Sequence, residues 1–350
     1  MTERDATVLS LARASQESGL STAAAPKRVT AADVARSLGL SRATVGFVLN
    51  DTPGQTIPEA TRERVLAEAK RLGYRANSAA RALASGRSRI ILLVLPEWPL
   101  DYSMRSHLDE ASLALDEAGY SLVTMTPHPG GQARPLWETL RPDVVIGMTP
   151  FDRERLAEIR ASGVPHVIPP VPSGADGSVG DLGFARGPRL QVEHLLHTGR
   201  RRLAFAASPD PRVADLVHQR RELALRTLVE ATGSGFADEA ALTETNAAAT
   251  VESWRDMAIE GVVAYNDDIG ALVLGAALRG GIEVPGRLAV IGHDDTPVAR
   301  LIVPALSSVR IDTAGLGRYL AALALSATGE APAPTAGPET DATLVARETT

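Results

Sequence analysis

The side chains of this 350-residue chain that are suited to catalysis do not assemble into a catalytic set. His293, Asp294 and Asp295 stand together but resemble a catalytic pairing only superficially, and His194 and His197 have the spacing of two metal ligands on one helix face. An enzyme needs a nucleophile, a base and an orienting group at one place. Because the sequence offers no such arrangement, no GxxxxGK[ST] loop and no GxGxxG after the first predicted strand, we expect no enzyme and interpret the two histidines as surface residues.

A second group of polar side chains follows predicted strands. Asn266 and Asp267 follow an apolar run and open a predicted helix, and Asp294 follows another apolar run. Ligands of open α/β sheets bind beside the carboxyl ends of the strands, where such residues meet. The alternative interpretation is structural: helix capping for Asn266 and Asp267, and a turn contact for Asp294.

A third group, between residues 41 and 50, is suited to DNA, and the stretch from Val29 to Asn50 predicts the two short helices that would hold it. Thr30 can cap the first helix with Asp33 three residues on, and Gly39 ends it. Ser41 caps the second helix, from whose first turn Arg42 and Ala43 point outward. This pattern is typical of a helix-turn-helix, in which the second helix reads base edges in the major groove. The alternative is an ordinary helical hairpin.

Composition limits the class of protein. There are no cysteines, which excludes disulfides, thiolate catalysis and cysteine-ligated zinc. No run of eighteen apolar residues is present, and the N-terminus does not resemble a secretory signal. We therefore expect a soluble, cytoplasmic, globular protein without membrane contact and without a cofactor.

Charge is unevenly distributed along the chain. From Lys27 to Ile90 there are 12 Lys+Arg and 5 Asp+Glu, a net charge of +7, while the remainder carries −13. A basic module on an acidic body is expected when one module meets phosphates and the other does not. A solvated basic face is the alternative.

The chain order predicts three regions before the body. Residues 1–26 are read as a disordered leader, and residues 27–74 as a three-helix domain whose third helix starts at Pro58. The buried side of that helix is expected to contain Val65, Leu66, Ala69 and Leu72. Residues 75–89 form either a linker or a hinge whose short helix, capped by Asn77, folds on DNA.

From residue 90 the pattern becomes α/β. We predict strands over residues 90–95, 121–125, 143–148, 164–168, 203–207, 261–264 and 288–291, and a last strand over 343–347. The helices are predicted over residues 107–118, 153–161, 191–196, 217–231 and 269–279, and no further regular element between 291 and 343. The alternation favours parallel sheets with helices on both faces, in two lobes with a cleft between them. We place the first lobe at about 90–180 and 309–328, and the second at about 181–308 and 340–350.

Taken together, these motifs resemble the lactose repressor (LacI/GalR) family of bacterial transcription regulators. The resemblance is carried by VTAADVARSLGLSRATV, VLN, TRERVLAEAKRLGY and RALA near the N-terminus, and by VEHLLHTGRRRLAF, YNDD and VIGHDDTPVARLIVPALSSVR in the body. It implies a helix-turn-helix domain on a two-lobed body like the periplasmic binding proteins. The implied function is a repressor that binds a near-palindromic operator as a homodimer, or as a dimer of dimers, and responds to a small-molecule effector in the cleft.

The resemblance also implies which residues meet DNA. Arg42 and Ala43 match the positions that select the operator, and Leu83 matches the hinge leucine that wedges into the central base step. Where the family usually carries Ser-Arg, this chain has Gly46-Phe47, which favours a changed operator over lost binding. The implied DNA-binding residues are Thr30, Ser41, Arg42, Ala43, Thr44, Phe47, Asn50, Asn77, Ala80 and Leu83.

The effector positions match more loosely. Arg221 aligns with the arginine of a family R-x-x-G motif, although Ala224 replaces the glycine, and Thr313 stands where an aromatic residue often stacks on a sugar. That replacement weakens the case for a sugar effector. The implied effector-binding residues are Glu97, Tyr102, Arg221, Asn266, Asp267 and Asp294, with Tyr102 equally suited to a core. The alternative functions are a DNA-binding regulator with a vestigial cleft and a stand-alone small-molecule-binding protein.

Overall fold

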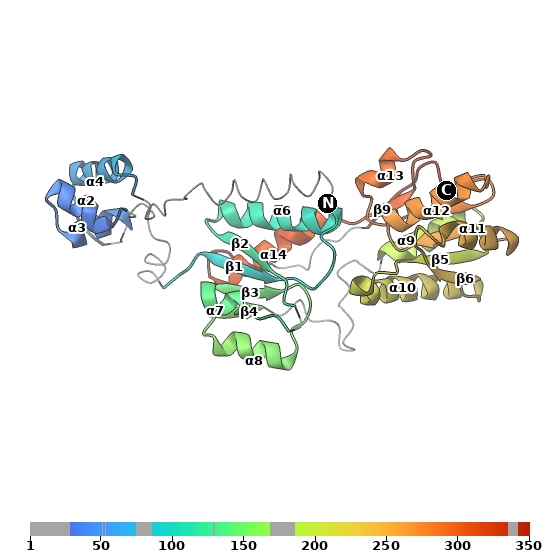
Figure 1. Ribbon diagram of the computed structural model, residues 1–350, viewed down its shortest axis with the longest axis horizontal. Coiled ribbons are helices and arrows are strands. Elements are labelled where there is room, and N and C mark those ends of the chain that lie inside the picture. Colours follow the sequence, from blue (N-terminus) through green and yellow to red (C-terminus); the bar gives the residue numbers. More distant parts are fainter. Residues whose placement is uncertain are drawn as a thin grey trace, which may run out of the picture. The chain divides into compact units, whose positions relative to one another are not determined.

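The computed structural model describes residues 29–50, 52, 54–74, 86–128, 130–168, 186–334 and 342–350 (Figure 1). The chain divides into an N-terminal unit that ends at Gly86 and a C-terminal unit that begins at Arg87. The predicted leader and the predicted hinge positions Asn77, Ala80 and Leu83 lie outside the described residues.

The N-terminal unit contains three described helices, α2 (Ala31–Leu38), α3 (Arg42–Leu49) and α4 (Glu59–Arg71). They close a small core, in which each helix contributes two buried apolar side chains: Val34, Ala35, Val45, Val48, Val65 and Ala69. The predicted burial of Leu66 is wrong, since its side chain is 49% exposed. Leu66 follows Val65 by one residue and therefore points about 100° away from it around α4.

The predicted caps of the helix-turn-helix are present. Thr30 and Asp33 form a reciprocal capping box at the start of α2. Gly39 ends α2 in the left-handed conformation, with a φ of 65° that an L side chain would resist. Ser41 caps α3, its Oγ accepting a hydrogen bond from the backbone N–H of Thr44 at 3.0 Å. These caps fix the turn that directs the start of α3 outward.

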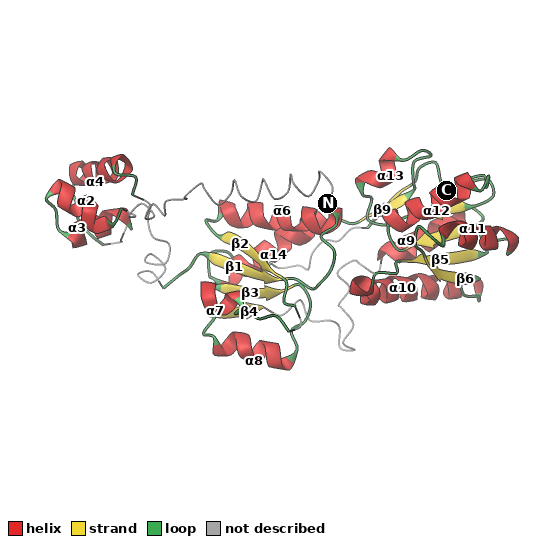
Figure 2. Cartoon of the chain, viewed as in Figure 1, coloured by secondary structure: helices red, strands yellow, loops and turns green. Residues whose placement is uncertain are grey.

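The first lobe of the C-terminal unit is a parallel sheet in the order β2-β1-β3-β4 (Figure 2). Its strands are β1 (Ile90–Val94), β2 (Ser121–Met125), β3 (Val144–Gly147) and β4 (His166–Ile168). Alternate residues of β1 enter different cores. Ile91 and Leu93 pack in a core shared by α6 (Tyr102–Glu117) and α14 (Thr313–Ala327). Leu92 and Val94 pack on the other face, with Trp137 of α7 (Leu136–Leu140) and Ile159 of α8 (Arg153–Ala161). Burial of both strand faces explains the continuous apolar run of β1.

The second lobe repeats this plan with the order β6-β5-β7-β8. Its strands are β5 (Leu203–Ala207), β6 (Asp238–Ala241), β7 (Gly261–Ala264) and β8 (Ala289–Ile291), with one continuous core. The helices are α9 (Arg186–His197), α10 (Ala214–Thr232), which follows a 3-10 turn (Pro211–Val213), α11 (Ala247–Asp256), α12 (Asp267–Arg279) and α13 (Pro297–Leu301). The antiparallel pair β9 (Ser308–Arg310) and β10 (Thr343–Val345) packs against α9.

Several elements were missed by the sequence analysis. The expectation of no regular element between 291 and 343 is wrong, because α13, β9 and α14 lie there. α14 contains Gly315 and Gly317, which lower helix propensity. Gly317 is nevertheless required by packing, since a Cβ there would lie 2.3 Å from the carbonyl oxygen of His107 on α6. The short α7, the polar edge strand β6, and α11 were also not predicted.

Candidate functional site

The exposed start of α3 is the candidate DNA-reading surface. Ser41, Arg42 and Ala43 are all exposed there. Arg42 has no ion-pair partner among the described residues, so its guanidinium donors are available. The hydroxyls of Ser41 and Thr44 are instead 2.8 Å apart and complete the cap of the helix. Of the predicted base-reading residues, Arg42 therefore has the group best suited to a base edge.

Gly46 and Phe47 lie on the same helix. Phe47 is half-buried and, within the described residues, is not among the apolar side chains packed on the core of the N-terminal unit. A Cβ added at Gly46 would meet no atom within 4 Å. The position of Phe47 outside that core fits the interpretation that this pair changes the operator.

Two further predicted DNA contacts serve the helix ends. Thr30 is exposed, but its hydroxyl donates to the Asp33 carboxylate at 2.7 Å within the capping box. Asn50 is exposed at the end of α3, where its backbone N–H donates to the carbonyl of Gly46 at 3.0 Å. Among the described residues its side chain has no hydrogen-bond partner.

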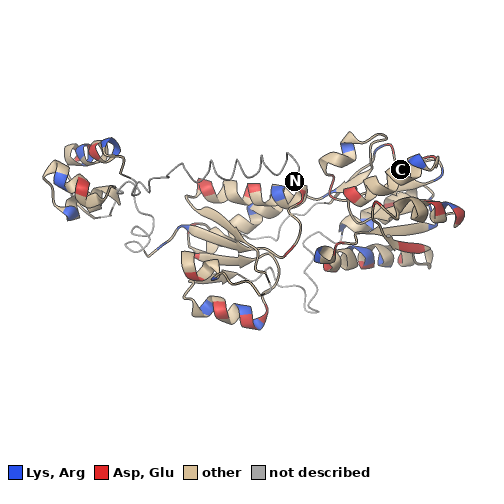
Figure 3. Ribbon diagram, viewed as in Figure 1, with Lys and Arg blue, Asp and Glu red and all other residues tan. Residues whose placement is uncertain are grey.

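The positive charge of this region lies mostly outside the three helices. Residues 29–74 hold six Lys+Arg and five Asp+Glu, so only +1 of the +7 between residues 27 and 90 belongs to the helical unit. Figure 3 shows both signs of charge on these helices. Asp33 pairs with Arg36 at 2.8 Å and Glu68 with Arg71 at 2.7 Å, which neutralises two of the acidic groups locally.

The candidate ligand site is centred on a buried ion pair in the second lobe. Arg220 of α10 donates to both oxygens of Asp294, at 2.8 and 3.1 Å, and to the backbone carbonyl of Tyr265 at 2.7 Å. Its guanidinium also lies over the Tyr265 ring, 4.8 Å from the centroid. Asp294 has a φ of 92°, which is an unfavourable backbone conformation. Two sets of hydrogen bonds hold it: its N–H donates to the carbonyl of Val309, and its carboxylate accepts from Arg220. Such conformations cluster at functional sites.

The electrostatics keep this pair charged. Burial alone would raise the pKa of Asp294, but the charge of Arg220 and the hydrogen bonds to its carboxylate bring that pKa well below its usual range. Burial is the largest effect that lowers the pKa of the neighbouring His293, and the charge of Arg220 lowers it further. The Nδ1 atom of His293 lies 2.7 Å from the Asp294 carboxylate. His293 is therefore neutral, and its Nδ1–H donates to the carboxylate. Its Nε2 faces Gly187, where a Cβ would lie 2.2 Å away.

Arg221, the predicted effector arginine, is not brought to this pair. Its guanidinium donates to Glu239 of β6 at 2.5 and 2.7 Å and also pairs with Glu222. Consecutive helix residues point about 100° apart, so only one of the two arginines can face Asp294. The sequence signal for Arg220 was available: Ala224 and Leu228, four and eight residues on, are buried on the same stripe of α10.

Asn266 has the capping role that was left open for it, whereas Asp267 has a structural role other than capping. Asn266 is half-buried and caps α12, its Oδ1 accepting from the Ile269 N–H at 3.0 Å. Asp267 is 0% exposed, and its two oxygens accept from Ser308 Oγ and Thr296 N–H at 2.5 Å each. Asp267 therefore ties α12 to the segment before α13 and to β9, and the structure does not offer it to a ligand.

Burial raises the pKa of Asp267 to about 7, against the opposing hydrogen bonds from Ser308 and Thr296. The folded state thus holds a proton between about pH 4 and pH 7 that the unfolded chain has lost. We expect this group to make the free energy of unfolding fall as pH rises through that window, by at most about 1.4 kcal/mol per pH unit. Urea unfolding at several pH values gives the slope of the unfolding free energy against pH. This slope should be less negative in Asp267→Asn than in the native chain. Equal slopes in the two proteins would contradict this assignment.

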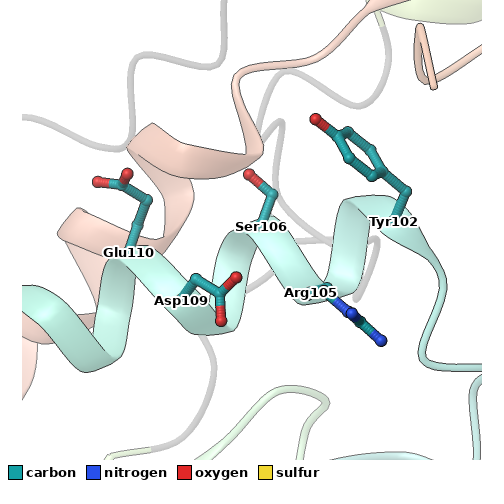
Figure 4. A pocket seen from close by; sticks show the side chains of 5 residues that line it. All are labelled: Tyr102, Arg105, Ser106, Asp109 and Glu110. Atoms are coloured by element: carbon teal, nitrogen blue, oxygen red, sulfur yellow. The ribbon is translucent and has the colours of Figure 1, made fainter. Parts of the chain in front are cut away.

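The remaining predicted effector residues, Glu97 and Tyr102, lie beside β1 and at the start of α6. Glu97 interacts with His128 Nδ1 at 2.9 Å, and its charge contributes weakly to the raised pKa of Arg212, after the larger effect of Asp210. Tyr102 is 51% exposed and borders a shallow, charged hollow on α6 (Figure 4). Within the described residues no hydrogen bond or ring contact joins Tyr102 to the Arg220–Asp294 pair.

Asp101 belongs to the first lobe and was not predicted as a site residue, but the charges of the Arg220–Asp294 pair affect its pKa. Asp101 caps α6 by accepting from the Met104 N–H at 2.8 Å. Burial raises the pKa of Asp101, and the charge of Asp294 raises it further while Arg220 opposes the shift. Trp98, from the same connection, packs against the core of the second lobe. The segment between β1 and α6 therefore borders the candidate ligand site.

In the part of the chain that the structure describes, no group of three or more His, Cys, Asp or Glu side chains is suited to holding a metal ion. His194 Nε2 instead lies 2.7 Å from Thr350 Oγ1. None of the described helices is long and apolar enough to cross a membrane.

Known families and proteins match both units. The family described as "Bacterial regulatory proteins, lacI family" matches residues 30–77, and the "Periplasmic binding protein-like domain" matches residues 192–350. The transcriptional regulator CelR of Thermobifida fusca is 30% identical over 327 residues, covering 88% of this chain and 94% of that protein. The regulator GalS of Salmonella typhimurium is 31% identical over 316 residues, covering 85% and 89%. These relatives are regulators of transcription and not enzymes.

Solved structures agree with this fold. The lac repressor dimer bound to operator and the anti-inducer ONPF matches with a TM-score of 0.72 and 22% identity, covering 92% of this chain and 99% of that chain. The CelR–cellobiose complex matches with a TM-score of 0.55 and 25% identity, covering 92% and 100%. The predicted fold class, a helix-turn-helix unit on a two-lobed periplasmic-binding-protein-like body, is confirmed. The chain belongs to the LacI family of bacterial transcriptional regulators.

Proposed function

We propose that this protein is a repressor that binds a near-palindromic DNA operator as a homodimer and is modulated by a small polar effector in its C-terminal unit. The observation that carries the proposal is the capped, exposed start of α3, with Arg42 free of ion pairs among the described residues. The lac repressor relative was solved as a dimer on its operator, which supports the same assembly here. Two copies of α3 would then enter successive major grooves.

Within each half-site, we assign base recognition to Arg42 and the positioning of the protein on the DNA to neighbouring residues. A guanidinium suits the O6 and N7 acceptors of guanine, and the methyl group of Ala43 suits a thymine methyl. Thr44 and Asn50, and Asn77 from the hinge, are assigned to phosphate or sugar contacts, which orient the protein without specifying sequence. Phe47 is assigned an apolar contact in the groove. Thr30 and Ser41 contribute by capping their helices.

Leu83 and Ala80 are assigned to the hinge in the central minor groove. Leu83 is the one large apolar residue between Tyr74 and Ser88, and an apolar wedge unstacks a base step and kinks the duplex. Leu83→Ala is therefore expected to reduce operator bending, as measured by a circular-permutation assay. A bend angle equal to that of the native protein would contradict the wedge.

The effector is assigned to the Arg220–Asp294 pair, and Asn266, Glu97 and Tyr102 stay candidates on the family resemblance alone. A buried carboxylate and guanidinium together suit a ligand with several hydroxyl or carbonyl groups, because one accepts and the other donates. The relative CelR was solved with cellobiose, which supports a polyhydroxy ligand, although Thr313 offers no aromatic face for stacking. Ligand binding would change the hinge geometry, and hence operator affinity, through a coupling free energy.

A second candidate is a regulator that needs no effector. It is favoured by one observation: Arg220 and Asp294 already satisfy each other's hydrogen bonds, and the pair is largely buried. Thermal-shift screening against metabolites separates the two functions, since a ligand at 100 times its Kd adds about 2.7 kcal/mol of stability. Absence of any stabilising metabolite across a broad library would favour the second candidate.

The DNA-binding proposal is tested by selection of the purified protein on random DNA, with sequencing of the bound fraction. We expect a near-palindrome whose centre contains an easily kinked pyrimidine–purine step. A bound fraction without any shared motif, retained only at low salt, would contradict sequence-specific binding. The salt titration of the enriched duplex distinguishes phosphate contacts from base readout.

A further inference from the structure

Arg87, Ser88 and Arg89 begin the C-terminal unit, directly after the segment that leads from the N-terminal unit. The carboxylate of Asp143, which precedes β3 and is nearly buried, accepts three hydrogen bonds from them. Its Oδ1 accepts from Ser88 N–H at 2.7 Å and Ser88 Oγ at 3.0 Å, and its Oδ2 accepts from Arg89 N–H at 3.1 Å. Arg89 has a φ of 57°, a left-handed conformation that these bonds hold in place.

A second carboxylate, that of Glu330, holds the arginine side chains of the same segment. It lies 2.7 Å from Arg87 Nη1 and 3.5 Å from Arg89 Nη2. The Arg89 guanidinium lies 5.0 Å from the centroid of the Tyr120 ring, and its Nη1 donates to the Ala118 carbonyl at 3.3 Å. Side chains from separate parts of the first lobe thus fix the backbone and side chains of residues 87–89.

Glu330 also ends a continuous route from the candidate ligand site. The N–H of Asp294 donates to the carbonyl of Val309 in β9 at 2.7 Å. The chain then passes through Asp312, which caps α14 by accepting from Gly315 N–H at 2.8 Å, and along the 15 residues of α14. Glu330 follows three residues after that helix. α14 is packed closely on α6 at Gly317. We expect a displacement at the start of α14 to reach Glu330 because a helix moves as a stiff element.

We propose that Asp143 and Glu330, the carboxylate clasp, are positioning residues for operator binding: they set the direction in which the chain leaves the C-terminal unit towards the DNA-binding helices, and Glu330 relays the ligand state. The inference rests on the proposed function. Neither carboxylate is expected to contact DNA. Their effect on affinity passes through Arg87, Ser88 and Arg89.

The clasp and simple electrostatics predict opposite changes in operator affinity for Glu330→Gln. Removing a negative charge near a DNA-binding segment should by itself strengthen binding to a polyanion. Loss of the clasp should instead weaken specific binding, because residues 87–89 are no longer held in one conformation. We therefore expect Glu330→Gln to weaken operator affinity by about fivefold, which is the scale of a partly exposed ion pair.

The chain offers a matched control in Glu110, which pairs with Arg318 of α14 at 3.0 Å. The side chains of that pair are 36% and 54% exposed, against 34% and 50% for Glu330 and Arg87. Both replacements therefore remove one charge and a comparable short ion pair, and Glu330→Gln also removes the longer contact with Arg89 at 3.5 Å. Full-length variants are compared by fluorescence anisotropy on the selected operator and on random DNA. Glu110→Gln is expected to bind operator as tightly as the native protein or slightly more tightly.

Two further variants complete the test. Asp143→Asn, which weakens three hydrogen bonds to a charged acceptor, should reduce operator affinity about tenfold or more without a matching loss on random DNA. In Arg87→Gln, adding Glu330→Gln should cause a smaller loss than it causes in the native protein, because only the 3.5 Å contact with Arg89 remains to be removed. If the native protein selects an operator but Glu330→Gln and Glu110→Gln bind it with equal affinity, the clasp is refuted and the proposed function is not. If native protein selects none, the proposed function fails before any variant is compared.

Discussion

Replacing Arg220 with methionine is expected to lower the free energy of unfolding of the C-terminal unit by about 3–5 kcal/mol, whereas the same replacement of Arg221 is expected to cost less than about 1 kcal/mol. The difference arises from burial. Arg220→Met leaves the Asp294 carboxylate, which is 8% exposed, without its counter-charge, while Arg221 and Glu239 are both about one-third exposed and water replaces their pairing. Urea unfolding followed by circular dichroism measures both values.

The same two variants test the assignment of the ligand site. Any metabolite that stabilises the native protein in a thermal-shift screen should stabilise Arg221→Met equally and should lose its effect on Arg220→Met. Because Arg220→Met is itself destabilised, isothermal calorimetry on the folded protein at low temperature provides the check on binding. Retained affinity in Arg220→Met together with lost affinity in Arg221→Met would return the role to Arg221, as the sequence resemblance implied.

The second large effect is expected at Arg42. One bidentate contact to a base is worth about 1–3 kcal/mol, and a dimer makes it twice, so Arg42→Ala should weaken operator binding by about 2–6 kcal/mol. Preference at one base of each half-site should relax at the same time. Repeating the selection with the variant, followed by anisotropy titration of the native operator, gives both results.

Arg64 of α4 provides the control for charge alone, since it is exposed and belongs to the same unit. Arg64→Ala removes the same charge from the N-terminal unit and should change affinity for operator and random DNA to a similar, small extent. A sequence preference that is unchanged in Arg42→Ala would refute its role as a base reader. Equal losses in the two variants would show that Arg42 contributes only its charge.

The elements that could be predicted from the sequence are those whose own residues specify them. The caps at Thr30 and Ser41 and the apolar runs of β1 and β5 are local signals, and the structure has the helices and strands that they indicate. α14 could not be predicted in this way, because Gly315 and Gly317 speak against a helix and only the close approach of α6 explains Gly317. Tertiary packing overrides local propensity there.

The candidate ligand site was predictable only in part for a similar reason. Asp294 could be placed from its position after a strand, but the choice between Arg220 and Arg221 depends on which face of α10 is buried. Family spacing indicated Arg221, while the burial of Ala224 and Leu228 indicates Arg220. Asp267 looked equally suited to a ligand, and only its contacts with Ser308 and Thr296 reveal a structural carboxylate.

Recognition of one DNA sequence by this chain is measured as the ratio of its affinities for the selected operator and for a scrambled duplex of equal length. The two dissociation constants are measured by anisotropy at two salt concentrations, with and without metabolites that stabilise the protein. We expect a ratio of at least about 10³ that persists at the higher salt. A ratio near one under all conditions would mean that the duplex is held by its phosphates alone, and would contradict the account.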